Sequence, residues 1–392
     1  MRKGFARYAF VYHTVRLYSR LVLRKYTYTT DIAPRMKEPI IAVANHTTEA
    51  DMFMTVRAFP KCMYYVCGEH LTRSKWGKAI TRLCDPIYAP RGGSMIGVIK
   101  EVYKRIKEGY SIMIFPEGCR SFNGETLRID AATAKFIKKS GAGLVTYHTS
   151  GGYFVAPRWS YVFRKGHCEG KIKGVYTAEQ LKELSVEEVQ EIINRDLYEN
   201  AHETQRKLAK PYDYTCDALA EGLENYLVIC PQCGAYDTLE SHKDSFHCTK
   251  CGHGGIYQPS GFFSGEGLKF DNVYDWGNWQ EERFDADQAG KTMDEVLFTE
   301  TDIALYQILP DHSRKEYGMG SLTATREGMT WTADDSAAPV PVMHFDYKRI
   351  QAESLLYYGK SMLFTDDTGY YGLTGEHFHA WKEDRLYNTC AR

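Results

Sequence analysis

Short apolar runs alternate with helical spacings of apolar residues in the first half of the chain. The segments PIIAVAN (39–45) and YSIMIFP (110–116) are short, apolar and rich in strand-forming residues, as buried strands are. Between them, residues 96–109 place apolar side chains at helical intervals. Short buried strands that alternate with helices imply a mostly parallel sheet. We therefore expect an α/β domain over residues 31–212, with its working residues at the strand ends.

Two capping boxes mark helix starts near the end of this domain, because in each a hydroxyl precedes a Gln or Glu by three residues. The boxes are formed by Thr177 with Gln180 and by Ser185 with Glu188. They predict helices that begin one residue after each hydroxyl. We expect the second helix to run to about residue 207, before Pro211 ends the pattern.

The last third of the chain changes to short alternating runs. Residues 320–333 predict two strands around a Glu-Gly turn, and residues 354–375 predict two or three more around Asp-Asp-Thr-Gly. A closing helix is expected near residues 377–387. We therefore expect residues 260–392 to form a small antiparallel β domain, a barrel or a sandwich, which is faintly similar to pleckstrin-homology-like domains.

The N-terminal segment, residues 1–30, predicts a basic amphipathic helix. Its arginines recur every four residues on one face: Arg16, Arg20 and Arg24. Apolar surface comes from Phe10, Leu17, Leu21 and Val22. Such a helix is typical of a segment that lies in the headgroup region of a membrane. The alternative is a helix docked on its own domain with its arginines in solvent.

Composition narrows the choice of partners. A formal net charge of −1 argues against nucleic acid as the main partner. Apolar runs stay short of the roughly 18–20 residues needed to span a bilayer. Arginines also interrupt every candidate for a signal-peptide core near the N-terminus. We therefore expect a protein that binds the cytoplasmic side of a membrane peripherally.

Four of the eleven cysteines form two close pairs, Cys230 with Cys233 and Cys248 with Cys251. The others are scattered and odd in number, which favours a reducing compartment over a disulfide framework. Two Cys-x2-Cys pairs can close a tetrahedral shell around Zn²⁺, and the glycine after each pair allows the positive φ that such a turn requires. The pattern predicts a structural zinc ribbon over residues 226–258. A redox dithiol is the alternative, against which the doubled pairs argue.

The segment NHTTEAD directly follows the strand expected at 39–44. If the chain turns into a helix there, His46 and Asp51 can face one pocket. A histidine titrates near neutrality and can remove a hydroxyl proton, while a carboxylate fixes its tautomer and stabilises the imidazolium. The pair therefore fits acyl transfer to an alcohol, in which the substrate's hydroxyl takes the place of a catalytic serine.

Spacing alone is weak evidence for this pair. His379 and Asp384 have the same spacing inside the expected β domain. Taken by itself, NHTTEAD also fits an ordinary helix start that is capped by Thr47 or Thr48.

Two further motifs strengthen the interpretation. FPEGCRS, with Glu117, Gly118 and Arg120, follows the second strand, and its Pro and Gly force a turn where α/β sheets bind ligands. Arg120 can contact a phosphate with two hydrogen bonds. PIYAPRGGS places Arg91 before two glycines, which let backbone amides approach an anion closely. For both arginines a surface ion pair is the alternative.

In this order, NHTTEAD, PIYAPRGG and FPEGCRS resemble the motifs of the glycerolipid acyltransferase family, which are NHxSxxD, an arginine motif and FPEGTRS. A fourth family motif, an apolar strand, is matched more faintly by residues 142–153. The resemblance covers roughly residues 1–210. Two positions differ from the family pattern, since Cys119 replaces Thr and Thr48 stands where Ser is common.

The resemblance implies a role for each matched residue. His46 would be the general base and Asp51 would orient it; Glu117, Gly118 and Arg120 would help shape the acceptor site, and Arg91 would bind the acceptor's phosphate. The donor would be an acyl thioester on coenzyme A or acyl carrier protein, and the acceptor would be lysophosphatidate.

Two alternatives to this function remain. One is acyl transfer to another acceptor, such as glycerol 3-phosphate or a lysophospholipid. The other is a non-catalytic, membrane-tethered scaffold for the zinc ribbon and the β domain. The intact set of His46, Asp51, Glu117 and Arg91 argues against the scaffold.

Overall fold

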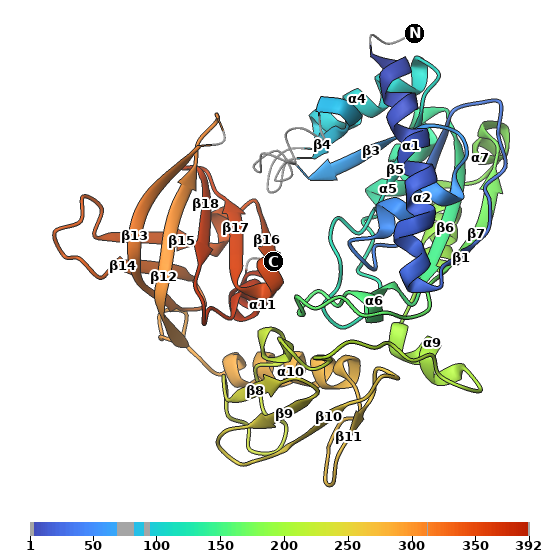
Figure 1. Cartoon of the computed structure of the whole chain (residues 1–392). Helices are drawn as coiled ribbons and strands as arrows, with labels where there is room; N and C mark the ends of the chain where they lie inside the picture. Colours follow the sequence, from blue (N-terminus) through green and yellow to red (C-terminus); the bar gives the residue numbers. More distant parts are fainter. Residues whose placement is uncertain (1–3, 69–81, 90–94, 312, 391–392) are drawn as a thin grey trace.

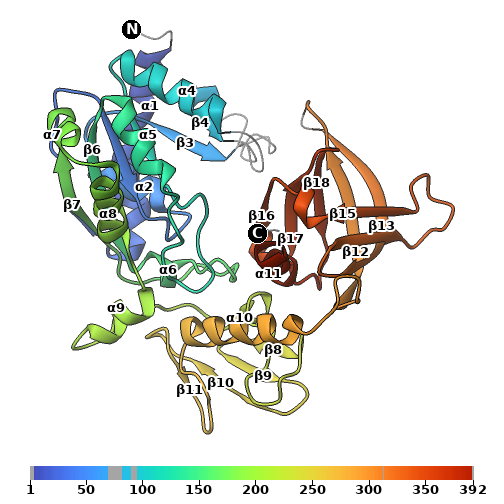
Figure 2. The same ribbon diagram turned by 180° about the vertical axis from the view of Figure 1, so that it is seen from behind.

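The computed structural model describes residues 4–68, 82–89, 95–311 and 313–390. Figure 1 shows an α/β region formed by the first half of the chain, a small β module below it and a larger β region beside it. Figure 2 shows the same three regions from behind, with α10 lying across the small module. The fold class expected from the sequence is confirmed.

Seven described strands form the sheet of the α/β region, in the order β1-β7-β6-β2-β5-β3-β4. All of their pairings are parallel except that of β6 with β7. The strands are β1 Thr29–Thr30, β2 Ile40–Ala44, β3 Met63–Gly68, β4 Ile87–Ala89, β5 Ser111–Ile114, β6 Gly143–Ser150 and β7 Glu169–Tyr176. The two strands expected from apolar runs, β2 and β5, are central neighbours in this sheet, so the segments that follow them meet at one edge.

Besides α1, this region contains seven described helices. They are α2 Asp51–Ala58, α4 Ile96–Lys107, α5 Ala132–Ser140, α6 Gly152–Val155, α7 Ala178–Glu183, α8 Val186–Leu197 and α9 Ala201–Lys207. Both predicted capping boxes are present at the starts of α7 and α8.

The helix expected to run from 186 to 207 is in fact two helices. The backbone N–H of Thr126 donates to Glu199 O at 2.8 Å, and the Glu199 N–H donates to the Thr126 hydroxyl at 2.8 Å. These bonds pull residues 198–200 out of the helical path. The Asn200 side chain then caps α9 by accepting from the Glu203 N–H.

The N-terminal helix α1 (Phe5–Leu23) packs on the α/β region through one face. The Tyr8 hydroxyl donates to Met63 O, and the Tyr12 hydroxyl donates to Phe59 O at 2.9 Å. Its other face leaves large apolar side chains exposed: Phe10 at 73%, Leu17 at 65% and Leu21 at 64%. The helix is thus docked on its own domain, as the alternative held, and still presents an apolar outer surface. Among the described helices, none is long and apolar enough to cross a membrane.

The cysteine-containing module is a four-stranded antiparallel sheet in the order β11-β10-β9-β8. Its strands are β8 Leu239–His242, β9 Ser245–Cys248, β10 Gly254–Tyr257 and β11 Phe263–Ser264.

Helix α10 (Val273–Ala289) lies in the region that was expected to be β-rich with one closing helix near residues 377–387, and the sequence analysis did not predict it. Its buried residues Val273, Trp276 and Phe284 recur on one face, and the Trp276 indole N–H donates to Ile229 O at 2.9 Å. Asn272 caps the first turn. Burial of this face against the ribbon stabilises a helix whose Gly277 and many acidic residues weaken the sequence signal.

The C-terminal sheet is antiparallel, in the order β15-β14-β13-β12-β18-β17-β16. Its elements are β12 Phe298–Ile308, β13 Arg314–Ala324, β14 Gly328–Ala333, β15 Val342–Asp346, β16 Ala352–Leu356, β17 Ser361–Thr365, β18 Tyr370–Thr374 and the helix α11 Ala380–Cys390. The strands predicted within 320–333 and 354–375 are confirmed. The closing helix α11 begins three residues later than expected, and it packs on β16 and β17.

Two large hydrophobic cores organise the described chain. One fills the α/β region around β2, β5 and β6. The other runs continuously from the ribbon through α10 into the C-terminal sheet, and it includes Phe122 and Trp159 from the α/β half. The ribbon and the β region therefore share one interior, which reaches into the segment after FPEGCRS.

Candidate active site

His46 and Asp51 meet where β2 gives way to α2. His46 follows the buried strand β2 by two residues, and Asp51 is the first residue of α2. The Nδ1 atom of His46 lies 2.8 Å from Oδ2 of Asp51, and the exposed fractions of the two side chains are 27% and 2%. A buried carboxylate therefore holds a ring that is partly exposed to solvent.

The Asp51 carboxylate is held by several further donors. It accepts from the backbone N–H of Thr47 at 2.7 Å and of Thr48 at 3.1 Å, and from the Thr47 hydroxyl at 3.1 Å. These bonds close the loop between β2 and α2 around the carboxylate and fix its orientation. Neither Thr47 nor Thr48 caps α2, because its N-cap position is Ala50, which makes no side-chain cap hydrogen bond.

The loop is also anchored to the sheet behind it. Asn45, which is 1% exposed, donates through Nδ2 to Thr149 O at 2.8 Å and accepts from the Thr149 N–H at 2.7 Å. The His46 ring stacks on Phe115, with centroids 4.8 Å apart and planes at 28°. With Nδ1 directed at Asp51, the ring adopts the tautomer in which Nε2 carries the free lone pair. The arrangement can therefore accept a proton at Nε2.

Glu117 binds the backbone of the same loop. Its Oε1 accepts from the His46 backbone N–H at 2.6 Å, and its Oε2 accepts from the Leu127 N–H at 2.7 Å. Burial raises the pKa of Glu117 to about 8 and nearby Asp51 adds to the rise, although the two backbone N–H groups oppose it. Each carboxyl oxygen accepts from the main chain, so Glu117 links the backbone of His46 to that of Leu127.

The remaining residues of FPEGCRS turn the chain and present a cation. Gly118 has φ of +76°, the left-handed region that favours glycine, and a Cβ atom there would meet open space. Arg120 donates to Glu49 Oε1 at 3.0 Å and to Ala156 O at 3.1 Å, and its side chain is 16% exposed. Arg120 therefore forms an ion pair with the NHTTEAD loop. Arg91 lies outside the described residues.

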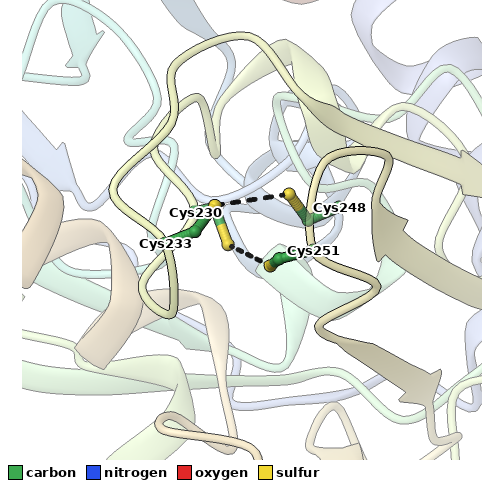
Figure 3. Close-up of side chains that lie close together, drawn as sticks. All are labelled: Cys230, Cys233, Cys248 and Cys251. Carbon is green, nitrogen blue, oxygen red and sulfur yellow. Dashed lines mark hydrogen bonds between the residues drawn. The ribbon is translucent and has the colours of Figure 1, made fainter.

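The four predicted zinc ligands converge (Figure 3). Their Sγ atoms all lie within 4.8 Å of one another, with Cys230 and Cys251 3.6 Å apart and Cys233 and Cys248 3.8 Å apart. A tetrahedral Zn²⁺ with bonds of about 2.3 Å requires sulfur atoms about 3.8 Å apart. The donor set and its spacing therefore fit one zinc ion.

The turns around these sulfurs also suit a metal. Gly234 and Gly252 have φ of +69° and +76°, and their N–H groups donate to Cys230 O and Cys248 O. Burial raises the pKa of Cys230 to about 12 although two backbone N–H groups oppose the rise, whereas at Cys248 burial is outweighed by hydrogen bonds from Thr238 and from backbone N–H groups, which lower its pKa to about 6. A bound metal would hold both as thiolates. In the described part of the chain, the metal-competent cluster contains the four cysteines and none of the nearby histidines.

The second pair with His-x4-Asp spacing does not form. The Nδ1 atom of His379 lies 3.2 Å from Oδ1 of Asp237 in the ribbon. Asp384 instead shares a hydrogen bond with the carboxyl group of Glu353, and burial raises the pKa of both. Equal spacing in the sequence therefore brings His46 to the aspartate five residues later, whereas His379 contacts an aspartate from a distant segment.

Sequence reasoning missed some residues around the site. Asn45 and Thr47 lie inside NHTTEAD, so their positions were visible, although their bonds to Thr149 and Asp51 were not. Glu49 also lies in this motif and pairs with Arg120. Arg158, which donates to Arg120 O at 2.6 Å, has no signal in the sequence because its partners come from two distant segments.

Residues 24–150, which contain NHTTEAD and FPEGCRS, match the family model described as Acyltransferase. A curated relative is the 1-acyl-sn-glycerol-3-phosphate acyltransferase of Borreliella burgdorferi, 27% identical over 124 residues, which are 30% of this chain and 49% of that protein. The chain thus spans about half the length of this relative. These matches confirm the resemblance to acyltransferases that the motifs indicated.

Two solved structures are similar in part. The 1-acyl-sn-glycerophosphate acyltransferase PlsC from Thermotoga maritima has a TM-score of 0.45 at 18% identity, over 53% of this chain and 85% of that chain. The N-terminal PH domain of Vps36 has a TM-score of 0.19 at 12% identity, over 25% of this chain and 83% of that chain. At these TM-scores neither structure carries an argument about this chain.

Proposed function

We propose that this chain is a glycerolipid acyltransferase that moves a fatty acyl group from an acyl thioester to the free hydroxyl of lysophosphatidate. The donor is acyl-CoA or acylated acyl carrier protein. The single observation that carries this proposal is the contact between His46 Nδ1 and Asp51 Oδ2 at 2.8 Å, on a ring that is 27% exposed. The acyltransferase family match over residues 24–150 supports the same reaction class.

The chemistry needs one base and no redox step. His46 Nε2 removes the proton of the acceptor hydroxyl as that oxygen attacks the thioester carbonyl. Asp51 stabilises the imidazolium that forms, and it keeps the ring oriented through its bond to Nδ1. When the tetrahedral intermediate collapses, the C–S bond breaks and the leaving thiolate takes the proton from His46. The products are an ester and a free thiol.

Arg120 is the reason to propose a phosphorylated glycerolipid as the acceptor. Arg120 is a cation beside the NHTTEAD loop, and within the described part of the chain its guanidinium donates to Glu49 and to a backbone carbonyl. A phosphate can replace Glu49 as its partner, because guanidinium binds phosphate with two charge-assisted hydrogen bonds. We propose Arg91 as the second phosphate ligand, with Gly118 giving room at the turn.

Zinc has a structural part in this proposal. Four thiolates would complete its shell, so no open position is left for a substrate. Bound zinc would stabilise the ribbon, and through the shared core also α10 and the C-terminal sheet.

We also propose that the protein works at the cytoplasmic surface of a membrane. The exposed Phe10, Leu17 and Leu21 of α1 would enter the headgroup region, with the neighbouring arginines facing anionic lipids. This places an enzyme with a lipid acceptor at the surface that holds the acceptor.

Labelled acceptors test the proposed reaction directly. The purified chain is given acyl-CoA or acylated carrier protein with lysophosphatidate, glycerol 3-phosphate or a lysophospholipid, and esterified product is measured. Faster product formation from lysophosphatidate supports the proposal. A preference for another acceptor would correct the substrate, and the absence of product with every acceptor would favour the scaffold.

A further inference from the structure

The loop that carries FPEGCRS packs on the C-terminal half of the chain. Phe122, the residue after this motif, belongs to the core shared by the ribbon, α10 and the C-terminal sheet. Its ring stacks on Tyr226, with centroids 5.3 Å apart and planes at 14°. The next residue, Asn123, donates through Nδ2 to Asn278 Oδ1 of α10 at 3.3 Å. The loop therefore forms part of the interface between the two halves of the chain.

Arg158 ties this loop to the C-terminal sheet. Its Nη1 donates to Arg120 O at 2.6 Å, and its Nη2 donates to Leu355 O in β16 at 2.7 Å. The guanidinium also lies 4.3 Å from the centre of the Phe122 ring. Because a guanidinium is planar and rigid, these contacts fix both the distance and the angle between FPEGCRS and β16.

The turn that follows β16 lies against the loop that carries FPEGCRS, since a Cβ atom on Gly359 would lie 3.7 Å from the Phe122 ring. Tyr358, in the short 3-10 segment Tyr357–Gly359 (η5), has φ of +62° and packs edge-on against Tyr161. Burial raises the pKa of Tyr358, the Glu49 carboxylate adds to the rise and the Arg120 cation opposes it. Its phenol is therefore within electrostatic reach of both Glu49 and Arg120.

We propose that the β16–β17 turn forms one wall of the acceptor site, and that Arg158 is the positioning residue that holds Arg120 for the acceptor's phosphate. This inference rests on the proposed acyl transfer to a phosphorylated acceptor. It gives the C-terminal half of the chain a part in the reaction, because β16 and its turn set the geometry of a phosphate ligand in the first half.

Steady-state kinetics of the full chain test this role. Arg158→Gln loses the charged fork, so the KM for the phosphorylated acceptor should rise about tenfold while the KM for the donor stays unchanged. Arg158→Lys keeps one charged donor and should restore part of the loss. Tyr358→Ala should also raise the acceptor KM. A folded Arg158→Gln protein with an unchanged acceptor KM would overturn the proposal.

Arg385 offers a matched control. Arg385 joins α11 to α10 within the C-terminal half, through Glu281 and Asp285, and these partners lie outside FPEGCRS. Arg385→Gln should lower thermal stability and leave the acceptor KM unchanged. Equal KM effects in Arg158→Gln and Arg385→Gln would reduce Arg158 to a general structural role and contradict the proposal.

Hydrogen exchange separates this proposal from the proposed function. In Arg158→Gln, amides of residues 118–124 and 355–360 should exchange faster together, whether or not an acceptor is turned over. Unchanged exchange in both segments would overturn the positioning role of Arg158, even in an active enzyme. A wild type that turns over no acceptor would refute the proposed function, and faster exchange in that case would leave Arg158 a structural link only.

Discussion

The Nδ1 atom of His46 lies 2.8 Å from the Oδ2 atom of Asp51. The contact depends on backbone geometry, since the loop between β2 and α2 wraps around Asp51 and gives it two backbone N–H donors. Glu117 reaches the same loop from the end of β5 and accepts from the His46 N–H. The segments that follow two neighbouring parallel strands, β2 and β5, therefore hold the His46–Asp51 pair in place.

The Asp51 carboxylate should be needed for the rate of the chemical step. Asp51→Asn removes the charge that stabilises the His46 imidazolium and disturbs the tautomer, so kcat should fall by roughly 10²- to 10⁴-fold. Asp196→Asn is a matched control, because Asp196 is buried in the same domain and accepts from the Thr146 hydroxyl instead. A kcat for Asp51→Asn equal to that of Asp196→Asn would contradict the role of Asp51.

The raised pKa of Glu117 predicts a dependence of stability on pH. Its ordinary value of 4.5 becomes about 8 in the folded chain, mainly through burial. Between these values the unfolded chain loses the proton that the folded chain keeps, so Glu117 makes the protein less stable as pH rises, and its effect levels off above about pH 8.

Thermal unfolding at several pH values checks this. The unfolding midpoint of Glu117→Gln should fall less between about pH 5 and pH 8 than that of the wild type, because the variant has no proton to lose. Glu49→Gln, which changes an exposed carboxylate, should keep the wild-type slope. Parallel profiles for Glu117→Gln and the wild type would show that Glu117 is ionised throughout this range.

The cysteine cluster should hold one zinc ion per chain. Combined replacement of Cys230 and Cys233 by Ser should abolish zinc in metal analysis and lower the unfolding midpoint, because structural zinc contributes about 10–16 kcal/mol to the folding of zinc-finger peptides. Cys216→Ser should keep the metal, since Cys216 lies outside the cluster. Full zinc content in the double variant would contradict the assignment. A wild-type chain with a Cys230–Cys233 disulfide and no metal would favour a redox dithiol.

Exposed side chains of α1 should bind anionic membranes. Because Tyr8 and Tyr12 hold α1 on its domain, removal of the whole helix would also damage the core. Replacement of Phe10, Leu17 and Leu21 by Ser avoids this. Each buried apolar side chain contributes roughly 1.5–3 kcal/mol, so sedimentation with anionic liposomes should weaken at least tenfold.

Two exposed apolar residues elsewhere in the chain control for that experiment. Met319 and Val342 are 47% and 52% exposed on the C-terminal sheet, and their replacement by Ser should leave liposome binding unchanged. Equal binding by the α1 variant and the wild type would refute the anchoring role of α1.

Local signals in the sequence predict much of the fold. Ile40–Ala44 is buried at every position and reads directly as a strand, and Thr177 and Ser185 form capping boxes that need only their own neighbours. The four cysteines likewise carry their own geometry. These features are short-range, so a single chain read in order contains them.

The parts that the sequence could not predict depend on distant partners. Asn200 starts a new helix because residues 198–200 pair with the loop at 125–126, more than seventy residues earlier. Helix α10 depends on the ribbon that buries Trp276. Arg158 makes its hydrogen bonds only when the fold brings the carbonyl groups of Arg120 and Leu355 to its guanidinium.

The pair of histidines gives the clearest lesson about spacing. His46 and His379 both precede an aspartate by five residues, yet His379 contacts Asp237 at 3.2 Å. Of the two histidines, only His46 contacts the aspartate five residues later, because it lies at a strand end where Glu117 from the neighbouring strand holds its backbone. For this reason the two histidines form a matched test.

The most direct test of the central claim is therefore the initial rate of acyl transfer to lysophosphatidate by wild type, His46→Ala and His379→Ala. Loss of the general base should lower the rate at least 10²-fold in His46→Ala, while His379→Ala should retain the wild-type rate in correctly folded protein. Equal rates for His46→Ala and the wild type would contradict the account.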